Sequence, residues 1–143
     1  MISTEFDIAQ FVQAAGDAII AANADGAIIF WNSAAERIFG YTKDEALGHS
    51  LDMIIPERLR KRHWEGYRQV VQSGRTRYGS EVLRVPAVRK DERPLSIAFT
   101  VALLFSPSAQ LQAIAAIIRD DTTHWNEERA LRQQLAGLKA KNS

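Results

Sequence analysis

The stretch Asp25-Gly26-Ala27-Ile28-Ile29-Phe30-Trp31-Asn32 decides the fold of this chain. It is an Asp-Gly pair followed by an apolar run, and another apolar run, residues 18–22, precedes it. Two short apolar runs on either side of an Asp-Gly turn predict a β-hairpin. After the second run Asn32 and Ser33 can cap a helix, and Ser33 with Glu36 fits a capping box. We therefore expect the hairpin to lead directly into short helices.

Helix start and stop signals continue after this point. Thr42 and Glu45 fit a second capping box. A longer helix is predicted over residues 57–73, opened by Pro56 and closed by Gly74. Helices of one or two turns are not stable alone in water, so the short ones are expected to pack on a sheet.

Three strand-like runs follow the longer helix, at residues 80–88, 95–105 and 111–119. Together with the hairpin they predict one antiparallel sheet of five strands with helices across one face, which is an α+β fold. In the middle run, period-two alternation places three apolar side chains on a common face: Ile97, Phe99 and Val101.

The chain divides into a central domain between two helical segments. Apolar residues at helical spacing predict a short amphipathic helix within residues 1–15. Residues 16–123 contain all the strand-like runs and form the expected central domain. Residues 124–143 are polar and have a helical pattern. The length of 143 residues suits one such domain with flanking helices.

The last segment carries a short heptad stripe, in which Leu131, Leu135 and Leu138 step by four and three. A helix with so narrow an apolar stripe is seldom stable alone, so we expect it to pair with its own copy or to continue into a following domain. Phe11, on the first helix, is a further candidate contact for a homodimer. The sequence does not show which of these two helices forms the dimer interface.

Composition excludes several classes of function. The 18 basic and 17 acidic residues leave a net charge of +1, which favours neither nucleic acid nor an anionic membrane. Without cysteine, disulfides, thiolate nucleophiles and Cys-ligated metals are excluded. No nucleophile–base pair, phosphate-binding glycine loop or carboxylate dyad stands at a catalytic spacing, so an enzyme is not expected. No signal peptide or membrane-spanning apolar run is seen, which indicates a cytoplasmic protein.

Several motifs in register resemble the PAS family of sensory domains. They span about residues 10–123 and are Asp25–Asn32, Ala34–Glu36, Ile38–Tyr41, Glu45–Gly48, Ile55–Arg58, Arg89–Asp91 and Ile118–Thr122. The resemblance implies a five-stranded sheet whose helices form a ligand pocket, in a dimerising module without catalysis. One departure is Glu92, where the family usually has glycine in this turn, because Glu tolerates a positive φ poorly.

The resemblance also implies an output route through the last helix. Asp121 and Thr122 match the strand-to-helix junction that couples pocket and helix in the family. From the residues alone, Thr122 or Thr123 is expected to be the N-cap of that helix, and both interpretations can hold together. A downstream signalling domain or partner protein is the expected recipient.

His63 resembles the axial histidine in the haem-binding PAS domains of FixL-type oxygen sensors, so the resemblance implies haem b with a gaseous ligand. A neutral imidazole is the usual proximal ligand of five-coordinate haem iron. Tyr67 follows on the same helix face, and Arg77 would pair with a propionate. The apolar distal wall would consist of Ile97, Phe99 and Val101. Direct counting places Leu83 where those sensors have an oxygen-binding arginine, and Arg84 reaches the pocket only through a bulge.

Alternatives remain open at this stage. His63 stands among basic residues that form a solvated helix face, and most PAS domains bind no haem. A ligand-free dimerisation or protein-interaction module, and a non-covalent flavin-binding redox sensor, are the other hypotheses. The lack of cysteine excludes thiol-linked chromophores. His49 and His124 have no metal-ligand spacing, and Trp31, Trp64 and Trp125 are expected to serve packing.

Overall fold

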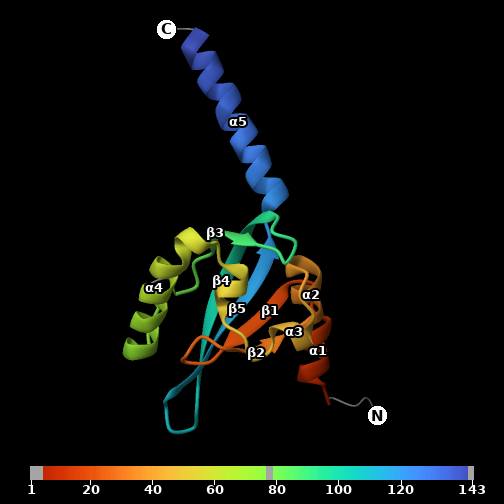
Figure 1. Ribbon diagram of the computed structural model, residues 1–143, viewed down its shortest axis with the longest axis vertical. Coiled ribbons are helices and arrows are strands. Elements are labelled where there is room, and N and C mark those ends of the chain that lie inside the picture. Colours follow the sequence, from red (N-terminus) through yellow and green to blue (C-terminus); the bar gives the residue numbers. More distant parts are fainter. Residues whose placement is uncertain (1–4, 77–78, 142–143) are drawn as a thin grey trace.

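The computed structural model describes residues 5–76 and 79–141 and shows the expected α+β architecture (Figure 1). Five antiparallel strands form one sheet in the order β2-β1-β5-β4-β3. The strands are β1 (Ala18–Ala22), β2 (Ile28–Trp31), β3 (Leu83–Val88), β4 (Pro94–Phe105) and β5 (Leu111–Asp120). The helices are α1 (Ile8–Ala14), α2 (Ser33–Phe39), α3 (Lys43–Ala46), η1 (Leu51–Ile54), η2 (Glu57–Leu59), α4 (Arg60–Ser73) and α5 (Thr122–Lys141). The predicted hairpin and five-stranded sheet are therefore confirmed.

The core lies between the inner face of the sheet and the short helices. Trp31 and Phe39 are fully buried, and their ring centroids are 5.7 Å apart. The Trp31 Nε1 donates a hydrogen bond to the Tyr41 carbonyl at 3.0 Å. Ile20 and Ile118 contribute to the same cluster from β1 and β5. Burial of these apolar side chains fixes the short helices on this face.

Asn32 is the buried polar residue of this core, with no exposed surface. Its Oδ1 accepts from the backbone N–H of Ala35 at 3.0 Å and of Ile19 at 2.9 Å. Its Nδ2 donates to the carbonyls of Val12 at 2.9 Å and Asp17 at 3.1 Å. Asn32 is thus the N-cap of α2, and the predicted capping box beginning at Ser33 is wrong, because Ser33 already belongs to the helix.

The structure also tests the other predicted helix ends and the turn at Glu92. Thr42 and Glu45 form the predicted capping box at the start of α3, with both reciprocal hydrogen bonds present. The predicted longer helix begins as the 3-10 turn η2, continues as α4, and ends at Gly74 with a left-handed φ of 67°. Glu92 also adopts a positive φ, of 69°. The turn between β3 and β4 therefore keeps the backbone geometry that favours glycine, with a glutamate in it.

The C-terminal helix α5 projects beyond the end of the sheet (Figure 1). The predicted N-cap at Thr122 or Thr123 is wrong, because both residues belong to the helix. The Thr122 hydroxyl bonds instead to Ser96 of β4. The Ser96 backbone N–H donates to Thr122 Oγ1 at 3.0 Å, and the Asp121 N–H donates to the Ser96 carbonyl at 2.8 Å. Across the described residues, none of the helices has the length and apolar character that a membrane span requires.

Candidate functional site

Three rings on α4 form an aromatic cluster against the β1–β2 turn. His63 and Trp64 meet edge to face with centroids 4.6 Å apart, and the Tyr67 ring lies 5.7 Å from His63. The Tyr67 hydroxyl donates to the Asn23 carbonyl in the turn at 2.6 Å. A Cβ added to Gly26 would lie 2.2 Å from the Trp64 ring, so this turn and the ring are in direct contact. The cluster therefore holds α4 to the hairpin.

A set of hydrogen bonds joins this cluster to η1 and the residues that follow it. The Trp64 Nε1 donates to Asp52 Oδ1 at 2.7 Å. The Arg60 guanidinium adds hydrogen bonds to the carbonyls of Asp52 at 3.2 Å and Ile55 at 3.1 Å. Trp64 and Tyr67 thus have structural partners, which agrees with a packing role for Trp64.

His63 differs from its neighbours because its buried Nδ1 has no hydrogen-bond partner among the described residues. Burial lowers the pKa of His63 below its usual value, and the nearby Asp52 carboxylate opposes the shift. Burial likewise raises the pKa of the Tyr67 phenol, to about 12. His63 therefore combines one buried ring nitrogen without a partner and a pKa that burial shifts in favour of the neutral imidazole.

The predicted pocket wall lies on the inner face of β4. Ile97 is buried, and Phe99 and Val101 are half-buried two and four residues further along the strand. Leu83 is the direct cross-strand partner of Phe99 and shares its face. These residues form one continuous apolar surface across β3 and β4.

Arg84 lies on the opposite face of the sheet. The pairing of β3 with β4 runs without a shift from Leu83 to Val88, and Arg84 pairs with Ala98. Because side chains alternate along a strand, Arg84 points away from the inner face. The bulge that would have brought Arg84 into the pocket is absent from this pairing. Arg77, expected near a propionate, lies outside the described residues.

An open cleft of about 520 Å³ lies between the η1–η2 segment and the β3–β4 turn. Apolar side chains including Met53 and Ile55 line it, with Arg58 and Arg60 from the helical side. This cleft was not predicted from the sequence, although Pro56 and the Arg89-Lys90 pair, which belong to the family motifs, line its two sides. His63 does not line it.

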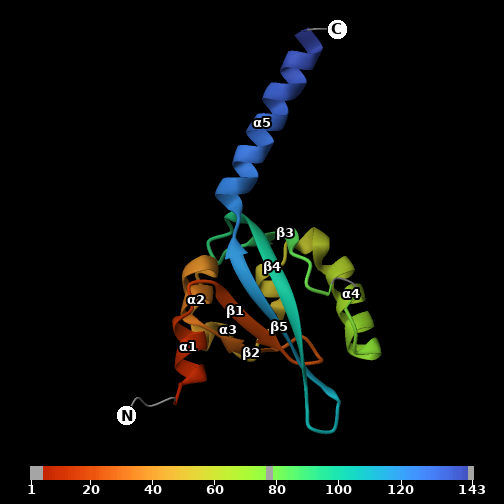
Figure 2. The same ribbon diagram turned by 180° about the vertical axis from the view of Figure 1, so that it is seen from behind.

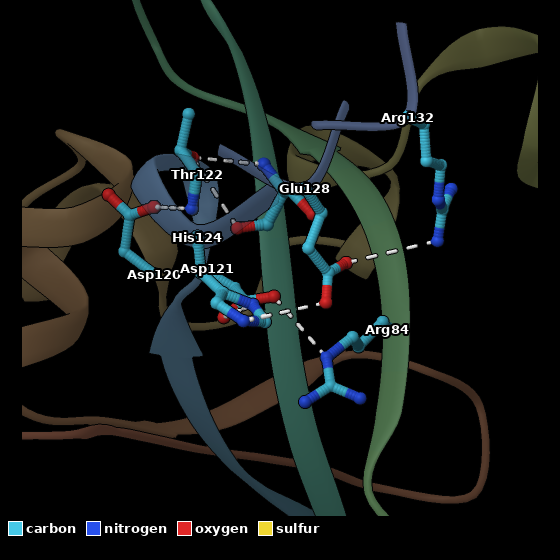
Figure 3. Close-up of polar contacts among 8 residues, drawn as sticks. Arg84, Asp120, Asp121, Thr122, His124, Glu128 and Arg132 are labelled. Carbon is cyan, nitrogen blue, oxygen red and sulfur yellow. Dashed lines mark hydrogen bonds and ion pairs between the residues drawn. The ribbon is translucent and has the colours of Figure 1, made fainter. Parts of the chain in front are cut away.

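The junction between β5 and α5 carries a polar network (Figure 3). Asp121 Oδ2 is 3.4 Å from Arg84 Nε, and Asp121 Oδ1 is 3.6 Å from His124 Nδ1. The other ring nitrogen of His124 is 3.5 Å from Glu128, which is 4.0 Å from Arg132. Asp121 thus connects β3 to the first turns of α5. Asp121 could be named from the sequence, but its partners Arg84 and His124 were not predicted. Arg84 lies far away in the chain, whereas the helical i,i+3 spacing of Asp121 and His124 is a local signal that could have indicated the second contact.

The candidate dimer residues are exposed. Phe11 is 61% exposed and packs against Phe6, with ring centroids 5.4 Å apart. On α5, Leu131, Leu135 and Leu138 are 64%, 55% and 59% exposed. Large apolar side chains on an isolated helix are typical of a surface that another chain covers.

Comparisons with known proteins agree with this architecture. Residues 7–120 match the family described as PAS fold. The chain is 26% identical over 116 residues to the oxygen sensor protein DosP of Escherichia coli, which covers 81% of this chain and 14% of DosP. It is 40% identical over 47 residues to the sensor protein FixL of Bradyrhizobium diazoefficiens, 33% of this chain and 9% of FixL. Both relatives are thus far longer than the matched region.

Solved structures show the same fold. A PAS domain from Colwellia psychrerythraea superposes with a TM-score of 0.70 at 23% sequence identity. The match covers 80% of this chain and 94% of that one. At this level of identity the likeness concerns the arrangement of the sheet and helices.

Proposed function

This chain belongs to the PAS family, and we propose that it is a signal-sensing domain that holds haem b through His63, responds to a gaseous ligand and relays its state through α5. The observation that carries the proposal is the buried His63 Nδ1 without a partner. The names of DosP and FixL as oxygen sensor and sensor protein support it, because both align with this chain.

His63 is the residue that would hold such a group. Burial lowers its pKa, which favours the neutral imidazole, the form that binds iron. Haem b, when bound, supplies an iron that takes a small gas as a reversible ligand. Tyr67 restrains the helix that carries His63 through its hydrogen bond to Asn23.

The distal side would be the apolar surface of β3 and β4. Leu83, Ile97, Phe99 and Val101 would exclude water there. The pairing of β3 with β4 directs Arg84 to the other face, so this wall contains no guanidinium. Because bound O₂ is held most firmly by a hydrogen-bond donor, CO or NO suits an apolar wall better than O₂.

Relay to α5 would use the contacts between β4 and the junction. Ser96 lies one residue before Ile97 and bonds the backbone of Asp121 and the hydroxyl of Thr122. A ligand that favours one position of β4 therefore changes the hydrogen bonds at the start of α5. Such a shift requires different ligand affinities in the two states. The receiving element would be a downstream domain or a second copy paired through Phe11 and the α5 leucines.

An absorption spectrum tests the haem assignment. Protein produced with haem available should show a Soret band, and His63→Ala should lose it. His49→Ala is the matched control, because His49 is exposed and should leave the band unchanged. A colourless protein that takes up no added haemin, or a full band in His63→Ala, would refute the assignment.

A ligand-free interaction domain is the second candidate. The observation that favours it is the cleft, which is open and does not include His63. In that case the protein would show neither a Soret band nor flavin fluorescence after denaturation, yet would still associate. Released flavin would instead support the non-covalent flavin hypothesis.

A further inference from the structure

The strand β3 is an edge strand whose backbone has a neighbouring strand on one side only. It stands last in the sheet order and pairs with β4. Just after β3, the Arg89 N–H donates to the Arg93 carbonyl on the β4 side at 3.0 Å. Backbone groups alternate between the two sides of a strand, so every second residue before Arg89 also faces β4. The other residues direct their backbone groups to the open side: Arg84, Pro86 and Val88.

These outward groups are the ones that an added strand would use. No described residue forms a backbone hydrogen bond with them. Arg84 and Val88 each offer an N–H and a C=O, and Pro86 offers a C=O alone, since proline has no N–H. Beyond Val88 the edge is closed, because the Lys90 N–H donates to the Phe39 carbonyl at 2.9 Å. The open edge therefore extends over residues 84–88.

The open cleft of about 520 Å³ lies along part of this edge. Pro86 and Val88 share one face of β3 and Ala87 lies on the other, yet all three line the cleft. Apolar residues of the η1–η2 segment form the opposite wall. Neither His63 nor Phe99 is part of the lining. The cleft is thus centred on the backbone edge of β3 and is separate from the proposed haem site.

The helical side of the cleft carries basic residues without acidic partners. Arg58 lines the cleft, and Lys61 and Arg62 follow at helical spacings of three and four, so the three side chains lie on one face. All three are exposed, and none forms an ion pair with a described carboxylate. The acidic residues of the lining are Glu57 and, on the far β3–β4 turn, Glu92. The basic residues of that turn already form ion pairs within the domain.

We propose that this cleft binds an extended acidic segment of a partner protein, which adds to β3 as a sixth strand and places carboxylates beside Arg58, Lys61 and Arg62. In this mode of recognition the main-chain hydrogen bonds supply affinity and the side chains supply specificity. Figures 1 and 2 show β3 near the start of α5, where Arg84 pairs with Asp121 at 3.4 Å. A partner bound at this edge therefore lies beside the helix that leaves the domain. Such binding requires neither haem nor His63.

An NMR titration of the nitrogen-15-labelled full chain tests the site. The probe is an acetylated and amidated peptide of three Glu-Val repeats, which should shift the Arg84 and Val88 amides saturably and slow their hydrogen exchange. Arg58→Glu should raise the dissociation constant by about tenfold or more, because an attraction becomes a repulsion. Arg68→Glu is the matched control, since Arg68 is exposed on α4 and outside the lining. At physiological salt this equal change in charge should alter the constant by less than about twofold.

Three further probes distinguish an added strand from simple attraction between charges. The same peptide methylated at every backbone nitrogen cannot donate to β3 and should not bind, and a peptide of three Lys-Val repeats should bind at least about tenfold more weakly. Inorganic polyphosphate should not reproduce the shifts of the Arg84 and Val88 amides. Equal binding of any of these probes, or no shift of the two amides with the Glu-Val peptide, overturns the proposal. Circular dichroism verifies that each variant is folded.

Discussion

Replacement of Asn32 by alanine should cost about 4 kcal/mol of folding free energy. The Asn32 side chain makes four hydrogen bonds in a fully buried site, two as acceptor and two as donor. Each is worth about 0.5–1.5 kcal/mol net, which gives roughly 2–6 kcal/mol in total. The N-cap of α2 alone accounts for about 1 kcal/mol of this. The remainder reflects backbone groups of Ile19, Val12 and Asp17 that lose their partner.

Urea unfolding measures the loss of folding free energy, and two further variants show which hydrogen bonds contribute to it. Asn32→Asp keeps an acceptor for α2 and β1 but cannot donate to the Val12 and Asp17 carbonyls. Because its carboxylate would be buried against these two carbonyl oxygens, it should destabilise at least as much as alanine and expose the amides of α1 to faster hydrogen exchange. Ser33→Ala is the control and should cost under about 0.5 kcal/mol, because Ser33 is not the cap. A larger loss for Ser33→Ala than for Asn32→Ala would refute the reasoning.

Three other predictions concern strain, packing and pH. Glu92→Gly should stabilise the fold by about 0.5–1 kcal/mol in urea unfolding, since the φ of Glu92 is 69° and glycine adopts a positive φ without strain. Glu81→Gly is the control and should give no gain in stability, because Glu81 is not among the residues with a positive φ. Gly26→Ala should destabilise the fold by about 1–3 kcal/mol, because the new Cβ would clash with the Trp64 ring. In a double-mutant cycle, Trp64→Ala should recover part of this loss of stability, whereas additive losses would contradict the contact. His63 has a pKa below its ordinary value of 6.5, so the unfolded chain binds the proton first on acidification. Its contribution to stability is therefore full above about pH 6.5 and falls below it, and His63→Leu should flatten the change between about pH 7 and pH 5; an unchanged slope would exclude this cause.

The strands and most helix ends could be predicted from the sequence, because they depend on local patterns. The Asp25-Gly26 turn, the Thr42–Glu45 capping box and the Gly74 helix end each need only residues a few positions apart. The apolar face of Ile97 and Phe99 follows in the same way from strand alternation.

The candidate site was predicted only in part, because its geometry depends on strand register and on distant partners. His63 could be named from its resemblance to haem-binding domains, but its unpartnered Nδ1 is a property of the packed cluster around it. The orientation of Arg84 depended on whether β3 contained a bulge, which local sequence does not encode clearly.

By itself the sequence determined the element order and the lack of thiol chemistry, since these follow from local periodicity and composition. The family was indicated by motifs that resemble it. Only the tertiary structure decided which polar groups meet. Asn32 rather than Ser33 caps α2 because Oδ1 also reaches the backbone of β1, and Thr122 bonds Ser96 instead of capping α5. Contacts between residues far apart in the chain are fixed by the packing of the whole core.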